Sequence, residues 1–165
     1  YSITKKCAEE LIISFCETFN LKYRIIRLCN VLGKGDKNAS KKKNALTWMI
    51  NKLKQNEEIE LYDNGEPKRE IIHIEDACRA IELISRKSEY NQTYNIGYGD
   101  YITIGNFIKI AKNKLNSKSE INFIKAPQFH AQVQNKDFFM DITKLNLLGF
   151  QPKYNHEDII QELCN

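Results

Sequence analysis

The first residues of the chain carry the first candidate chemistry. Tyr1 and Lys5 are four positions apart in a segment with helical periodicity, so one helical turn places both side chains on the same face. A tyrosine alone is a poor acid or base at neutral pH, but a fixed cation beside it stabilises the phenolate. The spacing therefore predicts a proton-transfer pair, and the alternative reading is a surface tyrosine beside a solvated lysine.

Composition places this pair in an ordinary globular protein. The chain has 165 residues, of which 42% are apolar and 28% charged, which is enough for one domain with a real core and too apolar for disorder. The net charge of +4 permits anionic ligands. It falls short of the basic stripe of a dedicated nucleic-acid binder, so we do not expect nucleic acid as a partner.

Cysteine usage and the absence of long apolar runs indicate a reducing compartment. The five cysteines are odd in number and include no C-x-x-C pair, so they are predicted to be free thiols in the cytosol. No apolar run approaches about 18 residues and no basic-then-apolar leader precedes the first helix, which predicts a cytoplasmic protein without a membrane partner. No cluster of His, Cys and carboxylate residues has metal-ligand spacing, so no metal site is expected.

Hydrophobic periodicity predicts an α/β fold. Helices are expected over residues 1–19, 45–53, 75–84 and 104–115, after residue 141 and after residue 155. Strands are expected over residues 23–32, 59–62, 69–74, 93–97 and 120–124. Thr103 and Asn155 are predicted helix caps, and the turn at residues 63–65 predicts a hairpin between the strands at 59–62 and 69–74.

Several separated stretches together resemble the extended short-chain dehydrogenase/reductases, the NAD-dependent epimerase/dehydratase family that acts on nucleotide sugars. The first, Tyr1-Ser2-Ile3-Thr4-Lys5 with Ala8-Glu9, is similar to the family pattern Y-x-x-S-K-x-x-A-E. Residues 27–36 resemble R-x-x-N-V-Y-G-P-G-D, and residues 62–76 resemble Y-G-D-G-x-x-x-R-D-F-I-H-V-x-D. Residues 94–97 and 141–152 match Y-N-I-G and D-x-S-K-x-x-x-L-G-W-x-P. The departures are Thr4 for Ser, Leu32 for Tyr and Lys34 for Pro.

The resemblance implies a role for each matching polar residue. Tyr1 would be the acid/base that takes a proton from a sugar hydroxyl, and Lys5 would hold the nicotinamide ribose, so both would contact the cofactor. Asn30, at the end of a strand, would bind the phosphate or sugar of the substrate. Arg69 would bind the nucleotide diphosphate through its guanidinium fork; without the resemblance it reads as a surface charge on a hairpin. His73 is expected to pack or hydrogen-bond locally.

The resemblance also implies a domain plan and a cofactor. The fold would be a partial Rossmann-type fold, the C-terminal half with the substrate-binding subdomain. Residues 1–35 would be the last helix and strand of the NAD-binding domain, and residues 36–165 mainly the nucleotide-sugar subdomain, with short returns to the cofactor domain. NAD is the expected cofactor, with NADP possible, but the chain lacks the glycine-rich turn that holds a dinucleotide pyrophosphate. We therefore expect a fragment that alone neither binds NAD tightly nor turns over a nucleotide sugar.

Three reactions and one non-catalytic function stay open. For the full-length parent, expected to be a homodimer, a nucleotide-sugar epimerase is favoured over a 4,6-dehydratase or a 4-keto reductase. The contrasting class is a non-catalytic binding module that uses the lysine-rich loop at residues 34–43. Neutralising Lys41, Lys42 and Lys43 would then abolish a strongly salt-dependent affinity.

Overall fold

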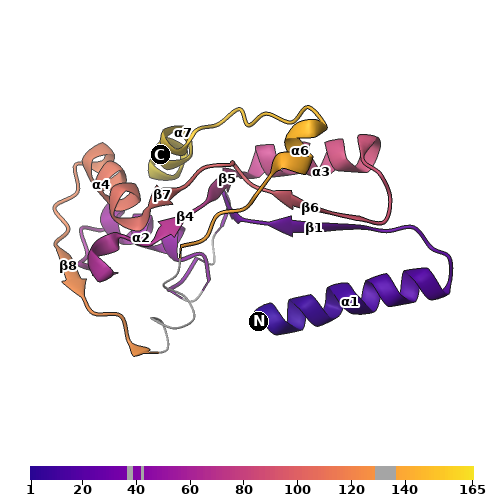
Figure 1. Cartoon of the computed structure of the whole chain (residues 1–165). Helices are drawn as coiled ribbons and strands as arrows, with labels where there is room; N and C mark the ends of the chain where they lie inside the picture. The colour runs from indigo at the N-terminus through magenta and orange to yellow at the C-terminus, as the bar shows by residue number, and fades with distance from the viewer. Residues whose placement is uncertain (37–38, 42, 129–136) are drawn as a thin grey trace.

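The computed structural model describes residues 1–36, 39–41, 43–128 and 137–165. The helices are α1 (Ser2–Thr18), α2 (Ala45–Lys54), the 3-10 turn η1 (Asp63–Gly65), α3 (Ile74–Lys87), α4 (Ile104–Leu115), α6 (Thr143–Leu147) and α7 (His156–Cys164). The strands are β1 (Arg24–Leu28), β2 (Asn30–Leu32), β3 (Ile59–Tyr62), β4 (Lys68–Arg69), β5 (Ile71–His73), β6 (Gln92–Ile96), β7 (Ile102–Thr103) and β8 (Ile121–Ile124). Helices alternate with largely parallel strands, which confirms the predicted α/β class (Figure 1).

The strand predicted over residues 23–32 is two strands with different partners. β1 pairs in parallel with β6, from Arg24 opposite Gln92 to Leu28 opposite Ile96. The N–H of Cys29 still donates to the carbonyl of Ile96 at 3.0 Å, and the chain then changes neighbour. β2 pairs in parallel with β5. Periodicity could not show this break because it results from a change of partner strand, from β6 to β5, and both partners are distant in sequence.

The predicted hairpin between residues 59–62 and 69–74 is wrong. β3 pairs in parallel with β8, and β4 pairs antiparallel with β7. Gly65 has a φ of +71°, and a Cβ there would lie 2.7 Å from the Cα of Gly105. The turn therefore packs against the start of α4 and directs β4 toward β7, the strand that leads into that helix, so a good turn sequence did not imply a hairpin.

Two apolar clusters form the core. One is built by β3, α2, α4 and α7 around Ile50, Phe107 and Ile159, all with 0% of their surface exposed. The other lies between β6, α3 and α6 around Ala80, Ile96 and Leu145. The proposed domain boundary after residue 35 is not tested by these clusters and stays a prediction.

Helix α1 stands apart from both clusters. It runs alongside β1 in the opposite direction, and none of its residues is buried (Figure 1). Its apolar stripe is exposed at Leu11 (71%), Phe15 (56%) and Phe19 (60%). A charged contact connects the helix to the sheet: Arg27 Nε donates to Glu9 Oε1 at 2.9 Å, and this hydrogen bond lowers the pKa of Glu9.

Local signals at helix ends were predicted well. Thr103 accepts a hydrogen bond from the N–H of Asn106, and Asn155 forms a full capping box with Asp158, so both predicted caps are confirmed. The helix expected over residues 75–84 is α3, which buries Ala80 fully, whereas Cys78 is exposed and Ile81 is 40% exposed. All five cysteines are free.

Candidate active site

Tyr1 and Lys5 meet at the start of α1. Lys5 Nζ lies 5.6 Å from the centre of the Tyr1 ring, as one turn of helix requires. Thr4 Oγ1 donates to the carbonyl of Tyr1 at 2.7 Å, which confirms that this hydroxyl makes a local hydrogen bond. The phenol is 92% exposed. The fold therefore brings the pair together but does not enclose it in a pocket.

Asn30 and Arg69 are connected through Glu70, the residue that follows Arg69. Asn30 opens β2 and is exposed, and its Nδ2 donates to the carbonyl of Glu70, the residue after Arg69, at 2.8 Å. Arg69 is half-buried on β4, where its Nη1 donates to the carbonyl of Lys68 at 2.7 Å. Burial lowers the pKa of the guanidinium and the charge of Asp137 counteracts this. Arginine stays protonated in proteins, so Arg69 is a preorganised cation.

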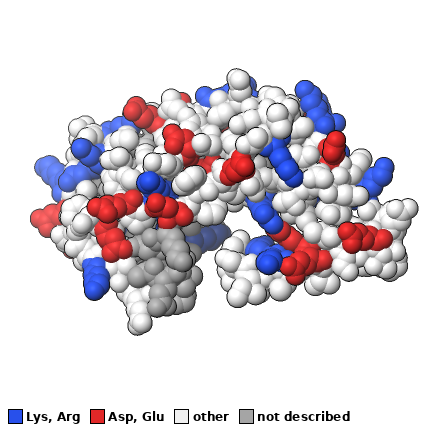
Figure 2. All heavy atoms as spheres, in the orientation of Figure 1, with Lys and Arg blue, Asp and Glu red and all other residues white. Residues whose placement is uncertain are grey.

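The two pairs lie at the same end of the structure. Because α1 and β1 run in opposite directions, the N-terminal end of α1 lies near the end of β1 that leads into β2 (Figure 1). Figure 2 shows the surface hollowed beside that end of α1. Ligands of open parallel sheets bind at the carboxyl ends of strands, which is the end where Asn30 lies.

The fold also contains a surface cavity of about 710 Å³. It is lined by α6 residues and by the flanking segments, among them Tyr98, Phe139 and Gln151. None of the four predicted site residues lines it. The cavity adjoins the candidate site through Gly99 and Met140, whose N–H groups donate to Glu70, the residue after Arg69.

Glu70 is a site residue that sequence reasoning missed. Its side chain is fully buried, with Oε1 accepting from the N–H of Gly99 at 2.7 Å and Oε2 from the N–H of Met140 at 2.8 Å. Burial and, to a smaller degree, this carboxylate raise the pKa of the nearby Cys29 thiol, which stays protonated. A sequence signal was present, because Glu70 falls at the acidic position after the arginine in the family pattern R-D-F-I-H.

His73 makes local hydrogen bonds, as predicted. It is 1% exposed, its Nδ1 accepts from the N–H of Glu75 at 3.3 Å, and its Nε2 lies 3.2 Å from Glu162 Oε2. Since Nδ1 accepts, the ring proton is on Nε2 and points to Glu162. Glu162 Oε1 also accepts from the N–H of Lys34 at 3.0 Å. Through Glu162, helix α7 thus holds the loop at Lys34 that follows β2.

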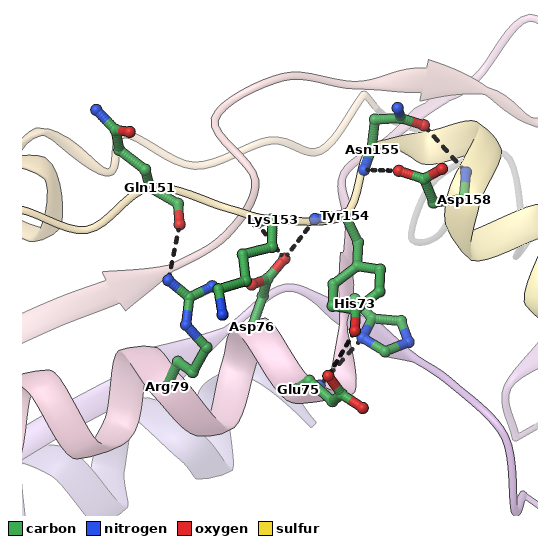
Figure 3. A network of polar contacts seen from close by, with 9 residues as sticks. All are labelled: His73, Glu75, Asp76, Arg79, Gln151, Lys153, Tyr154, Asn155 and Asp158. Carbon is green, nitrogen blue, oxygen red and sulfur yellow. Dashed lines mark hydrogen bonds and ion pairs between the residues drawn. The ribbon is translucent and has the colours of Figure 1, made fainter.

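Asp76 does more than begin its helix. Its fully buried carboxylate accepts from the N–H groups of Lys153 and Tyr154, at 2.9 and 3.0 Å, and forms an ion pair with Arg79 (Figure 3). The hydroxyl of Tyr154 donates to Glu75 Oε2 at 2.6 Å, and the Tyr154 ring lies 3.9 Å from His73. This clamp fastens the segment before α7 to the start of α3.

The lysine-rich loop is partly engaged by neighbouring side chains. Lys41 Nζ lies 3.3 Å from Glu60 and 5.8 Å from the centre of the Tyr62 ring, whereas Lys37 and Lys42 lie outside the described residues. Within the part of the chain that the structure describes, no group of three His, Cys, Asp or Glu side chains could hold a metal ion. Over the same residues, no helix has the length and apolarity needed to cross a membrane.

Comparison with known proteins identifies relatives of this chain. A sequence model of the "NAD dependent epimerase/dehydratase family" matches residues 1–97. The low-salt glycan biosynthesis protein Agl12 of Haloferax volcanii is 30% identical over 96% of this chain and 49% of its own length. The dTDP-4-dehydro-6-deoxyglucose reductase of Escherichia coli is 26% identical over 99% of this chain and 50% of its own. The chain thus spans about half the length of the curated relatives it matches.

A solved structure shares the fold. The UDP-glucose 4-epimerase of Thermotoga maritima, crystallised with UDP-glucose, superposes with a TM-score of 0.87 at 23% identity, over 99% of this chain and 52% of that one. The architecture is therefore that of Rossmann-type extended short-chain dehydrogenase/reductases. Taken with the match over residues 1–97, this shows that the chain belongs to the NAD dependent epimerase/dehydratase family.

Proposed function

We propose that the chain is the substrate-binding portion of an NAD-dependent nucleotide-sugar epimerase and that it carries the acid/base pair of that enzyme. The observation that supports this most is the arrangement at one end of the sheet. There α1 begins with the exposed Tyr1–Lys5 pair, at the same side of the structure as the end of β1 that leads to Asn30, which is hydrogen-bonded to the residue after Arg69. Residues 1–35 complete the cofactor domain in this proposal, and residues 36–165 mainly bind the nucleotide sugar.

The residues fit a nicotinamide cofactor at the start of α1. The Lys5 ammonium and the Tyr1 phenol are both exposed and adjacent, so neither must leave a buried partner to meet a ribose. The cofactor, when bound, accepts and returns hydride at a sugar carbon. NAD is the cofactor proposed, and NADP is the alternative.

The chemistry of the chain itself is a proton transfer beside a bound diphosphate. Tyr1 removes the proton from the sugar hydroxyl, and the charge of Lys5 stabilises the phenolate that does so. Arg69 binds phosphate oxygens with its guanidinium fork, while Asn30 offers both a donor and an acceptor to the sugar or phosphate. Binding through these two residues holds the reacting carbon beside Tyr1.

The relatives keep two other reactions of the same site open. They include a protein named as a reductase and another named as a dTDP-D-glucose 4,6-dehydratase. Epimerisation is favoured because it uses the Tyr1–Lys5 pair without requiring a further acidic pair. We place the full-length enzyme in the cytoplasm, as a homodimer.

A product analysis tests the proposal. The full natural polypeptide that contains these residues is incubated with NAD⁺ and, separately, UDP-glucose and dTDP-glucose, and the sugars are identified by NMR. An epimerase yields the 4-epimer, a dehydratase the 4-keto-6-deoxy sugar, and a reductase shows turnover only with a reduced nicotinamide and a keto sugar. The proposal predicts the first result, with loss of turnover in Tyr1→Phe. Turnover that persists in Tyr1→Phe would show that another group moves the proton.

A further inference from the structure

The carboxylate of Glu70 connects three segments that are distant in sequence. Its oxygens accept one backbone N–H from the loop after β6, at Gly99, and one from the segment before α6, at Met140. Its own N–H donates to the carbonyl of Phe138 at 3.0 Å, and its carbonyl accepts from Asn30 Nδ2. Glu70 is fully buried, and its N–H, its carbonyl and both carboxylate oxygens are hydrogen-bonded. These contacts fix the position of the residue.

The position of Glu70 determines where Asn30 and Arg69, the two residues proposed to bind the substrate, lie. Glu70 separates β4 from β5, and successive side chains of an extended chain point to opposite sides. Turning the Glu70 side chain into the core therefore turns the Arg69 side chain away from it. The carbonyl of Glu70 holds the Asn30 amide directly. One buried group thus sets the orientation of both.

The contacts require a carboxylate of this length. The two backbone N–H groups bond different oxygens of Glu70, so both ends of the carboxylate must accept, and glutamine has an acceptor at only one of them. The fit is close, because a Cβ added at Gly97 would lie 2.2 Å from Glu70 Oε1. Glutamine at position 70 would direct an NH₂ group at one of the two donors, and alanine at position 97 would displace the carboxylate.

We propose that Glu70 is a positioning residue of the nucleotide-sugar site, which holds Asn30 and Arg69 in the geometry that binds the substrate diphosphate. The proposal rests on the proposed function. It requires that two unrelated changes, Glu70→Gln and Gly97→Ala, produce the same binding defect, since both displace one carboxylate.

Nucleotide titration tests the consequence for binding. The full natural polypeptide is titrated with UDP, dTDP and GDP by calorimetry, and KM and kcat are measured with the sugar nucleotide that turns over. Glu70→Gln and Gly97→Ala should each raise Kd and KM about tenfold, the loss expected for a charge-assisted hydrogen bond, and change kcat less. In an Asn30→Ala/Arg69→Ala background, Glu70→Gln should add little, because both residues that it orients are already gone.

A matched control separates positioning from stability. Ser117 is also buried, and its hydroxyl donates to the carbonyl of Leu53 at 2.7 Å in the other core cluster. Ser117→Ala should lower the Tm and leave Kd and KM unchanged. Glu70→Gln variants that lose thermal stability but keep wild-type Kd and KM would overturn the proposal, as would effects that multiply fully in the Asn30→Ala/Arg69→Ala background.

An NMR measurement tests the positioning role of Glu70 even if the proposed function is wrong. Failure of the wild-type polypeptide to bind any of the three nucleotides would refute the proposed function alone. The side-chain amide signals of Asn30 should still shift and lose exchange protection in Glu70→Gln and Gly97→Ala, and not in Ser117→Ala. Unchanged Asn30 signals in both variants would overturn the positioning role itself.

Discussion

The clamp at Asp76 provides a stability prediction with a calculable size. Oδ2 of this fully buried carboxylate accepts the N–H groups of Lys153 and Tyr154. Asp76→Ala leaves both donors without their acceptor, at about 1–3 kcal/mol each. We therefore expect a loss of about 3 kcal/mol in the free energy of unfolding. For a domain of this size, that loss lowers the Tm by roughly 6–12 °C.

Two further variants show which oxygen of Asp76 matters. Asp76→Asn keeps one acceptor oxygen for both backbone donors and loses only the ion pair with Arg79, whose side chain is 36% exposed. It should cost about 1 kcal/mol, and Arg79→Ala about as little, since partly exposed ion pairs contribute little. Urea unfolding followed by circular dichroism measures all three. Equal losses in Asp76→Ala and Asp76→Asn, or a loss below about 1 kcal/mol in Asp76→Ala, would refute the account of the clamp.

Three other predictions follow from contacts away from the clamp. Glu9→Gln weakens the contact with Arg27, so α1 should show faster amide exchange while α4 does not; unchanged exchange in α1 would contradict this. Asn155→Ala removes a capping box and should cost about 1 kcal/mol in urea unfolding, whereas no measurable loss would refute the role of the cap. Burial lowers the pKa of His156, with Asp100 partly opposing it, so the unfolded state binds this proton at higher pH than the folded state. Stability should therefore fall as pH drops below about 6.5, and His156→Asn should lose part of that fall; the same pH profile in both proteins would exclude His156 as its source.

Local features of the fold could be predicted from the sequence because they depend on neighbouring residues. The caps at Thr103 and Asn155 and the meeting of Tyr1 with Lys5 need only a few consecutive side chains and a helical turn. The α/β class also follows from the periodicity of separate segments. The family motifs went further, since they indicated the residues at the candidate site.

Features set by partners distant in sequence could not be predicted. The break at Cys29 exists because β1 and β2 have different neighbours, which no local pattern records. The buried carboxylates of Glu70 and Asp76 are satisfied by N–H groups far along the chain, at Met140 and Tyr154 among others. Acidic side chains usually lie at the surface, so the local sequence does not indicate that these two are buried.

Hydride transfer in Tyr1→Phe is the most direct test of the proposed function. The full natural polypeptide is mixed rapidly with UDP-glucose or dTDP-glucose, and the absorbance of the reduced nicotinamide is followed through a single turnover. We predict that Tyr1→Phe slows its appearance by about 10²–10⁴-fold, the usual contribution of a positioned acid/base, and leaves nucleotide affinity unchanged. Reduction of the nicotinamide at the wild-type rate in Tyr1→Phe would contradict the role of Tyr1 as the acid/base of this site.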